Sequence, residues 1–331
     1  MSEILVLSQS FGRWSPEPAR LLEEGGLAAR RVPAGPPLTS AQVREHLRES
    51  VGLGTSPGDG PVQGLVVGLD EIDAAVVETA AGAGVQVLAK HGVGVDNIDV
   101  AAAAAAGIPV VNAPAMNAGA VADLVLGLVL GLLRRIPEAQ DGLRGGQWPV
   151  LAGPELGELT VGIAGYGRIG RAVARRVAGF DAPIAAFDPF LPEDAFGTAR
   201  RAVDLEELLA TSDLVTLHLP GGQDRPVLDA SALATMRRGS YLVNAARGDL
   251  VDEHAVAAAL HDGHLAGYAA DAFHDEPPRD SPVLTAPNTL LTPHMGAFSH
   301  AANRAMGTSL ARSILDALAG RELEHAVHPT A

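Results

Sequence analysis

Short runs of apolar residues alternate with stretches of helical periodicity along the first third of the chain. Four apolar runs predict buried strands: 4–8, 64–69, 85–90 and 108–112. The stretches between them predict helices: 16–24, 40–50, 72–81 and 100–106. Because strands that alternate with helices form a parallel sheet covered on both faces, this part of the chain predicts a doubly wound α/β domain.

The alternation begins again near Thr160 and continues almost to the end of the chain. Six further apolar runs predict strands: 161–164, 184–187, 214–219, 241–244, 267–270 and 289–291. The predicted helices in and around this half are 118–136, 205–210, 253–261 and 297–318. We expect the first and last of these helices to cross between domains. The pattern therefore predicts two Rossmann-like domains with doubly wound parallel sheets, the second inserted into the first, with boundaries at 1–112 plus 295–331 and at 113–294.

A glycine-rich turn follows the first strand of the second half. Gly165-Tyr166-Gly167-Arg168-Ile169-Gly170 lies between a strand and a predicted helix, the context in which GxGxxG indicates dinucleotide binding. Gly165 permits the tight turn, Gly167 lets a pyrophosphate approach the backbone, and Gly170 lets the helix pack on the strand. The free amides around Arg168 and Ile169 favour the phosphate charge. An ordinary glycine turn is the alternative if the pattern is taken alone.

An acidic residue at the end of the next strand narrows the cofactor. Asp188 lies 23 residues after Gly165, close to the ~20 residues that separate the turn from the ribose-binding carboxylate in dinucleotide domains. We expect Asp188 to accept hydrogen bonds from the adenosine ribose and to repel a 2′-phosphate. Pro189 and Phe190 follow it, so no adjacent arginine could receive that phosphate. The sequence therefore predicts NAD rather than NADP.

Composition limits the remaining function classes. The chain has no cysteine, which excludes disulfides and thiol nucleophiles, and no metal site is predicted. Its formal net charge of −15 disfavours nucleic acid and anionic membranes as partners. The most apolar segment, 124–133, falls short of the ~20 residues that span a bilayer, and the first residues show no secretory signal. We therefore expect a cytoplasmic protein that acts on a small molecule.

Three polar side chains follow predicted strands of the second half. Arg247, Glu276 and His294 are expected at the carboxyl edge of the sheet, where doubly wound domains bind ligands. Arginine suits carboxylate and carbonyl recognition, and histidine exchanges a proton near neutral pH while a carboxylate orients its ring. Each residue alone could be an ordinary surface or capping residue. Together, downstream of a dinucleotide turn, they favour hydride transfer to a ketone.

Seven segments, in this order, resemble the D-isomer-specific 2-hydroxyacid dehydrogenases, most closely the phosphoglycerate dehydrogenase-like branch without a regulatory domain. They are KHGVGVDNID from 90, NAP from 112, GYGRIG from 165, HLP from 218, NAARG from 244, DAFHDEP from 271 and TPHMGA from 292. The resemblance implies an NAD-dependent enzyme that interconverts a small 2-keto acid and a D-2-hydroxy acid. It also implies a homodimer built through the cofactor domain.

The resemblance further implies roles for individual residues. Arg247 would bind and polarise the keto acid, with His294 as the acid/base and Glu276 as its partner. Asp271 would hold the nicotinamide carboxamide. Further cofactor contacts are expected at His218, Pro220 and Ala245. A substrate-binding loop is expected in the first, flavodoxin-like domain at His91, Val93 and Gly94.

The substrate and one alternative function are left open. The substrate could resemble 3-phosphoglycerate, hydroxypyruvate or phosphonopyruvate. A phosphorylated substrate needs further cations, and the candidates that the sequence cannot place are Arg13, Lys90, His91 and Arg134. Arg13 and Trp14 follow the first strand and could line the substrate side. The alternative function is an NAD(H)-sensing binding protein of the same fold with weak catalysis. A Rossmann methyltransferase is not favoured, because it does not explain the Arg–Glu–His set.

Overall fold

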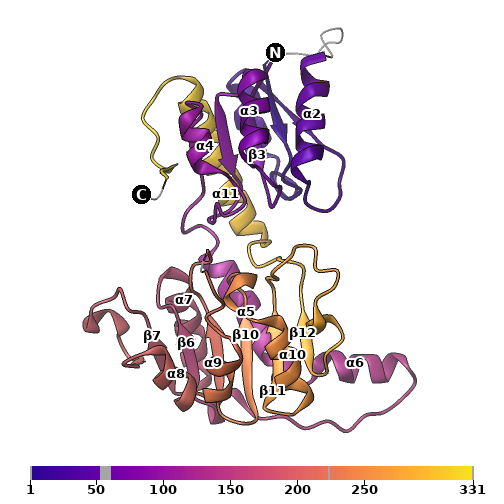
Figure 1. Ribbon diagram of the computed structural model, residues 1–331, viewed down its shortest axis with the longest axis vertical. Helices are drawn as coiled ribbons and strands as arrows, with labels where there is room; N and C mark the ends of the chain where they lie inside the picture. The colour runs from indigo at the N-terminus through magenta and orange to yellow at the C-terminus, as the bar shows by residue number, and fades with distance from the viewer. Residues whose placement is uncertain (1, 53–60, 223, 330–331) are drawn as a thin grey trace. The chain divides into compact units, whose positions relative to one another are not determined.

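The computed structural model describes residues 2–52, 61–222 and 224–329, which form two compact units (Figure 1). Unit 1 comprises Met1–Asn117 and Ala297–Ala331, and unit 2, Ala118–Gly296, is inserted between these two parts of the chain. The insertion and the two largely parallel sheets confirm the predicted fold class. Both unit boundaries lie slightly later in the chain than the predicted ones.

Within the described residues, unit 1 has a six-stranded sheet in the order β13-β5-β4-β3-β1-β2. Its strands are β1 (Ser2–Val6), β2 (Leu27–Arg31), β3 (Val62–Val67), β4 (Val87–Lys90), β5 (Val110–Val111) and β13 (Ala326–Val327). Its helices are α1 (Glu17–Glu24), α2 (Ser40–Gly52), α3 (Ala74–Gly82), α4 (Val100–Ala105) and α11 (His300–Leu318). All strand pairs are parallel except β13 with β5. The carboxyl ends of β1, β2, β3 and β4 therefore share one edge of the sheet.

Strand β2 was not predicted, because the sequence Leu-Ala-Ala-Arg-Arg has neither a continuous apolar run nor a clear alternation. It pairs in parallel with β1 along its whole length, from Ser2 opposite Leu27 to Val6 opposite Arg31. Strand β1 is almost fully buried, as expected for a strand covered on both faces. Tertiary pairing with this strand, rather than local propensity, makes residues 27–31 extended.

Within the described residues, unit 2 has a seven-stranded parallel sheet in the order β12-β11-β10-β9-β6-β7-β8. Its strands are β6 (Val161–Ala164), β7 (Ile184–Phe187), β8 (Arg200–Arg201), β9 (Leu214–Leu217), β10 (Ser240–Asn244), β11 (Leu265–Ala270) and β12 (Thr289–Leu291). Its helices are α5 (Ala118–Leu133), α6 (Ile136–Arg144), α7 (Arg168–Val177), α8 (Leu205–Thr211), α9 (Ala230–Thr235) and α10 (Glu253–His261). Six of the seven strands were predicted; the short edge strand β8 was not.

The prediction of a single helix over 118–136 is wrong, because α5 ends at Leu133 and a second helix, α6, begins at Ile136. Arg135 adopts a left-handed backbone with φ 51° and ψ 40°, and α6 then begins at Ile136 with Pro137 in its first turn. Proline lacks an amide donor and its ring clashes with the preceding helical turn, so α5 cannot continue through it. Helix α5 itself is apolar on most sides because it packs against α7 and against β10, β11 and β12. No helix in the described ranges is long and apolar enough to cross a membrane.

Candidate active site

The glycine turn between β6 and α7 depends on two close backbone approaches. Gly165 has φ 90°, and a Cβ there would lie 2.5 Å from the carbonyl oxygen of His218 at the end of β9. A Cβ on Gly170 would lie 2.1 Å from the carbonyl oxygen of Gly165. Both positions therefore require glycine, the first for its left-handed conformation and both for packing. Helix α7 consequently begins immediately beside the end of β6.

Gly167 differs from Gly165 and Gly170, because close packing does not require a glycine at this position. A Cβ there would meet no atom of the described chain within 4 Å. It caps the N-terminus of α7, where the amides of Arg168 and Ile169 have no acceptor within the helix. Open space beside two free amides and a positive helix end suits a diphosphate. The turn thus fits the pyrophosphate of a dinucleotide.

Asp188 lies at the end of β7 and contacts the glycine turn directly. Its Oδ2 accepts a hydrogen bond from the amide of Tyr166 at 2.9 Å, and its Oδ1 accepts one from the amide of Phe190 at 3.0 Å. The Tyr166 side chain is buried and stacks on Phe196 with 5.2 Å between ring centroids. These contacts fix the Asp188 carboxylate beside the turn, where the prediction requires it.

Three other predicted cofactor residues follow the neighbouring strands β9 and β10. The His218 ring lies within the protein, with its Nε2 at 3.0 Å from Thr216 Oγ1, and burial lowers its pKa to about 3. Its imidazole is therefore neutral, and we expect His218 to serve the site through its backbone contact with Gly165. Pro220 is exposed and Ala245 is half-buried, so both can contact a ligand.

Asp271, at the end of β11, holds the turn that carries His294. The residue is 2% exposed. Its Oδ1 accepts hydrogen bonds from Thr292 Oγ1 at 2.6 Å and from the Met295 amide at 2.8 Å, and its Oδ2 accepts one from the Gly296 amide at 2.8 Å. Burial raises the pKa of this carboxyl, although the same donors oppose the rise. The contact with a nicotinamide carboxamide stays a prediction.

His294 and Glu276 form a close pair within unit 2. Nδ1 of His294 lies 2.8 Å from both Glu276 oxygens, and Glu276 Oε1 also accepts a hydrogen bond from the Phe273 amide at 3.1 Å. A carboxylate at Nδ1 selects the tautomer that carries its proton there. Among the described residues, Nε2 has no hydrogen-bond partner, and the His294 side chain is 30% exposed. Nε2 is therefore the nitrogen that can exchange a proton with a ligand.

Arg247 lies in a loop that is fixed by a fully buried side chain. Asn244, the last residue of β10, donates from Nδ2 to the carbonyl of Arg247 at 2.7 Å and accepts at Oδ1 from the amide of Ala246 at 3.1 Å. The Arg247 guanidinium donates from Nη1 to the Ala246 carbonyl at 2.7 Å. The loop is thereby rigid on the backbone side, and the Arg247 side chain remains half-buried at the end of the strand.

Gly248 brings the Arg247 loop against the loop that carries Glu276. A Cβ on Gly248 would lie 1.8 Å from the carbonyl carbon of Phe273 and 2.2 Å from the amide nitrogen of His274. The two backbones can pass this closely only because residue 248 has no side chain. The structure therefore places the loops of all three predicted catalytic residues along the same edge of the sheet, after β10, β11 and β12.

In unit 1, the predicted substrate loop presents two free amides. Val93 is exposed, and among the described residues neither its amide nor that of Gly94 has an acceptor. The loop is held from its other side, where Asn112 Nδ2 donates to the Val93 carbonyl at 2.7 Å and the Ala113 amide donates to the Gly92 carbonyl at 3.0 Å. Successive free amides form a concavity suited to an anion such as a carboxylate.

The two basic residues before this loop are engaged in the fold. Lys90 is buried, and its Nζ donates to the Gly68 carbonyl and to Asn97 Oδ1. His91 is 7% exposed, its Nδ1 lies 2.9 Å from Ser10 Oγ, and burial lowers its pKa to about 4. The buried ring is neutral near pH 7 and offers the substrate no charge, and a direct contact of His91 with substrate stays a prediction. We expect His91 to act through the loop that it supports.

Sequence reasoning missed the residues that hold these groups in place, chiefly Asn244 and Thr292. Asn244 is the last residue of the largely buried strand β10 and Thr292 directly follows β12, and a polar residue at a strand end was the available signal. Their roles depend on partners in other segments, which the sequence does not bring together. Within the described ranges, no group of three or more His, Asp or Glu side chains could hold a metal ion.

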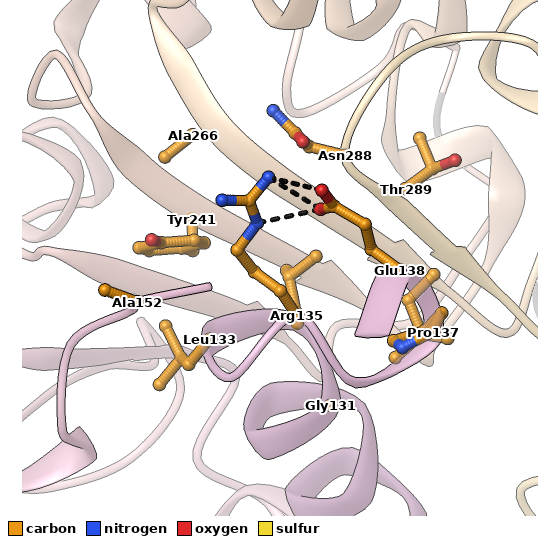
Figure 2. A pocket seen from close by; sticks show the side chains of 12 residues that line it. Gly131, Leu133, Arg135, Pro137, Glu138, Ala152, Tyr241, Ala266, Asn288 and Thr289 are labelled. Atoms are coloured by element: carbon orange, nitrogen blue, oxygen red, sulfur yellow. Dashed lines mark hydrogen bonds and ion pairs between the residues drawn. The ribbon is translucent and has the colours of Figure 1, made fainter. Parts of the chain in front are cut away.

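A cavity of about 310 Å³ lies at the opposite edge of the unit 2 sheet. Its walls include Tyr241 and Thr289, near the first residues of β10 and β12. Arg135 and Glu138 both line this cavity, and Figure 2 shows their side chains paired. The guanidinium donates two hydrogen bonds of 2.8 Å to the carboxylate. The cavity is thus at the amino ends of the strands and is separate from the His294 site.

Comparisons with known proteins agree with this fold. The sequence model described as "D-isomer specific 2-hydroxyacid dehydrogenase, NAD binding domain" matches residues 126–296, just over half of the chain. The D-3-phosphoglycerate dehydrogenase of Methanocaldococcus jannaschii is 40% identical over 248 residues, which cover 73% of this chain and 47% of that protein. The Mycobacterium tuberculosis D-3-phosphoglycerate dehydrogenase is 39% identical over 284 residues, which cover 82% and 54%.

The chain spans about half the length of these curated relatives. A solved structure of similar length, the TT0316 protein from Thermus thermophilus, superposes with a TM-score of 0.83 at 33% identity. The alignment covers 98% of this chain and 99% of that one. The similarity therefore extends over both units described above.

Proposed function

The chain belongs to the D-isomer-specific 2-hydroxyacid dehydrogenases, and we propose that it is an NAD-dependent oxidoreductase that interconverts a small 2-keto acid and its D-2-hydroxy acid. The observation that carries the proposal is the Glu276–His294 pair, with Nδ1 held at 2.8 Å and Nε2 left for a reactant. The substrate resembles 3-phosphoglycerate and hydroxypyruvate, or phosphonopyruvate.

Cofactor binding is assigned to unit 2, whose residues 126–296 match the family's NAD-binding domain. The glycine turn and the α7 N-terminus would hold the pyrophosphate, and Asp188 would bind the adenosine ribose. When bound, the nicotinamide supplies or accepts the hydride. The carboxylate at Asp188 favours NAD over NADP, because it would repel a 2′-phosphate.

Within unit 2, substrate binding is assigned to Arg247; within unit 1, a carboxylate-binding role is separately assigned to the loop that contains Val93 and Gly94. The Arg247 guanidinium has a planar fork of donors, which matches a carboxylate or a polarised keto oxygen. The free amides of Val93 and Gly94 would hold the substrate carboxylate. The Arg247 contact would orient the carbonyl and draw electron density toward its oxygen, which would make the carbon a better hydride acceptor.

Proton transfer is assigned to His294. During reduction, Nε2 would donate a proton to the carbonyl oxygen as that oxygen gains charge, and during oxidation it would remove the hydroxyl proton. Glu276 would keep the ring in one orientation and stabilise the imidazolium form by its opposite charge. General acid–base catalysis of this kind contributes typically ~10²–10⁴-fold to the rate.

A homodimer formed through unit 2 is a further part of the proposal. Helix α6 and the segment after it expose apolar side chains, with Leu143 at 55%, Trp148 at 86% and Val150 at 94%. Three large apolar side chains this exposed within one short segment suit a surface that a partner covers. Val150→Asp should therefore lower the mass measured by light scattering, and an unchanged mass would argue against this interface. The cytoplasmic location stays a prediction.

The test of the activity compares His294→Asn with wild type on a panel of 2-keto acids: hydroxypyruvate, phosphohydroxypyruvate, phosphonopyruvate, pyruvate and glyoxylate. We expect kcat to fall by at least about 100-fold, while the dissociation constant for NADH, measured by fluorescence, stays within a factor of two or so. His261→Asn, an exposed histidine at the end of α10, is the matched control.

Near-normal turnover by His294→Asn would refute the acid/base assignment. If wild type reduces none of the panel and still binds NADH tightly, the NAD(H)-sensing function replaces the enzymatic one. Equal catalytic efficiency with NADH and NADPH would refute the role of Asp188.

A further inference from the structure

A second cavity, of about 280 Å³, lies in unit 1 where β1 and β2 end. Besides Ala34, its walls combine apolar side chains of the strand ends with polar residues of the strand ends and following loops: Val6, Ser8, Gln9, Arg13, Arg31 and Val32. Two of these six residues are arginines from segments that are distant in the sequence. The β1–β2 pairing brings them together, since Val6 lies opposite Arg31.

Neither arginine forms an ion pair with a carboxylate of the described chain. Arg31 donates to the carbonyl of Phe11, and Arg13 lies over the ring of Trp14 at 5.8 Å from its centroid. Arg30, the residue before Arg31, is in contrast paired with Glu3 at 2.9 Å. In a chain with 39 acidic residues and 24 lysines and arginines, two neighbouring arginines without a carboxylate leave a locally positive site.

The two positive charges also disfavour each other. Partial burial and the charge of Arg13 both lower the pKa of Arg31. A bound anion would relieve both effects, because it would pair with the two guanidinium groups at once. Guanidinium groups bind phosphate, phosphonate and carboxylate through paired hydrogen bonds.

The loop after β1 is built to keep the two arginines near each other. Gly12 has φ 61°, and a Cβ there would lie 3.1 Å from Arg31 Nη2. A side chain at this position would therefore press on the guanidinium as well as strain the backbone. Trp14, on which Arg13 rests, stacks in turn on His300 with 6.2 Å between ring centroids.

The same loop connects the cavity to the proposed carboxylate loop of unit 1. Ser10 Oγ lies 2.9 Å and Ser8 Oγ 3.3 Å from Nδ1 of His91, two residues before Val93. Both features lie at the carboxyl edge of the sheet, and β4 and β1 are separated by two strand spacings, roughly 10 Å. A ligand that reaches both must therefore be short and must carry an anionic group at each end.

We propose that Arg13 and Arg31 bind the distal anionic group of the substrate, a phosphate, a phosphonate or a second carboxylate, and so select doubly charged 2-keto acids over singly charged ones. This inference rests on the proposed function and names its substrate class. The other candidate cations are less suitable. Lys90 is engaged, His91 is neutral, and Arg134 lies between Leu133 and Arg135, which line the cavity at the amino ends of the unit 2 strands, away from His294.

The experiment compares Arg13→Gln and Arg31→Gln with wild type on two substrate pairs, phosphohydroxypyruvate against hydroxypyruvate and oxaloacetate against pyruvate. We expect kcat/KM for the preferred doubly charged acid to fall about 10–100-fold in each variant, the loss expected for one charged hydrogen-bonding group. Efficiency with the singly charged partner should stay within a factor of about two. Arg20→Gln, which removes an exposed arginine of α1 and the same charge, is the control and should change neither value.

Three results would overturn the proposal. The first is an equal loss for doubly and singly charged substrates, the second is no loss for either, and the third is a loss with Arg20→Gln that matches the variants. Arg31→Lys keeps the positive charge without the planar fork, and we expect an intermediate loss. This variant tests the site if Arg31→Gln does not fold.

Calorimetric titration separates this proposal from the proposed activity. Phosphohydroxypyruvate and inorganic phosphate are titrated into wild type and into each variant. If wild type binds phosphohydroxypyruvate but turns over no 2-keto acid, the proposed function fails, and loss of binding in the variants still supports the anion site. If inorganic phosphate binds through both arginines while kcat/KM is unchanged in the variants, the site serves a free anion and the substrate assignment is wrong.

Discussion

Asp271→Asn is the substitution that best separates two roles for one carboxylate. As a ligand of the nicotinamide carboxamide, Asp271 would chiefly affect cofactor binding. In the structure its oxygens accept hydrogen bonds from the Thr292 hydroxyl and from the amides of Met295 and Gly296, which follow His294. His294 has φ 49°, a left-handed conformation that costs about 1 kcal/mol or more for a residue other than glycine. We therefore expect Asp271 to hold His294 in its active position.

The magnitude follows from the three hydrogen bonds. An asparagine keeps one acceptor oxygen, so at least one buried donor faces the amide nitrogen of the new side chain and is left unsatisfied. That loss costs roughly 1–3 kcal/mol, and the remaining bonds lose their charge assistance. Burial raises the pKa of Asp271, so the neutral side chain recovers part of the desolvation cost of the carboxylate. A net loss of about 2 kcal/mol in local stability would lower kcat about 30-fold if it falls on the His294 turn.

The assay measures three quantities for Asp271→Asn: the free energy of unfolding in urea, the dissociation constant for NADH and the pH profile of kcat. We expect a loss of kcat and a displaced or flattened profile, with NADH binding nearly unchanged. Thr292→Val removes one donor and leaves the carboxylate, so its loss of kcat should be smaller. Asp252→Ala is the control for stability alone, because Asp252 accepts hydrogen bonds from the amides of His254 and Ala255 at the start of α10.

The outcome that refutes this role is specific. If NADH binding weakens strongly in Asp271→Asn while kcat and its pH profile at saturating NADH stay as in wild type, the carboxylate binds cofactor and does not position His294. If Asp252→Ala lowers kcat as much as Asp271→Asn, the effect reflects general destabilisation, and the positioning argument fails.

Three other substitutions test separate features. Gly248→Ala should abolish most activity and destabilise the fold by at least about 1–3 kcal/mol, because its Cβ would overlap the Phe273 backbone; Gly82→Ala, which meets nothing within 4 Å, should be tolerated. Asp188→Asn should lower the ratio of kcat/KM for NADH over NADPH by about 10-fold while the Tyr166 contact is kept; an unchanged ratio would count against the ribose contact. Burial lowers the pKa of His91 from 6.5 to about 4, so the free energy of unfolding should fall by roughly 3 kcal/mol as the pH falls from 6.5 toward 4, because the unfolded chain binds a proton that the buried ring does not. His91→Gln should therefore reduce acid destabilisation in urea titrations over that window, and a profile identical to wild type would contradict the assignment.

The sequence predicted those parts of the fold that local patterns determine. Strands such as β6 and β11 are continuous apolar runs because both their faces are covered, and this pattern is visible without the structure. The GxGxxG turn was equally visible, because its glycines act on their immediate neighbours. Strand β2 and the break at Arg135 were missed. The first is stabilised by pairing with β1, and the second depends on a left-handed backbone at Arg135, a residue type that does not mark such a conformation in the sequence.

The candidate site shows the same limit for single residues. Adjacent arginines on β2 have different partners, since Arg30 pairs with Glu3 at 2.9 Å and Arg31 lines a cavity beside Arg13. His91 and His294 likewise differ in burial and in their partners. Burial lowers the pKa of His91 to about 4 and removes its charge. His294 stays partly exposed with a carboxylate at Nδ1. The type of a residue therefore shows which chemistry its side chain is capable of. Whether the side chain can take part in the reaction depends on its burial and on partners from distant segments, which the sequence does not reveal.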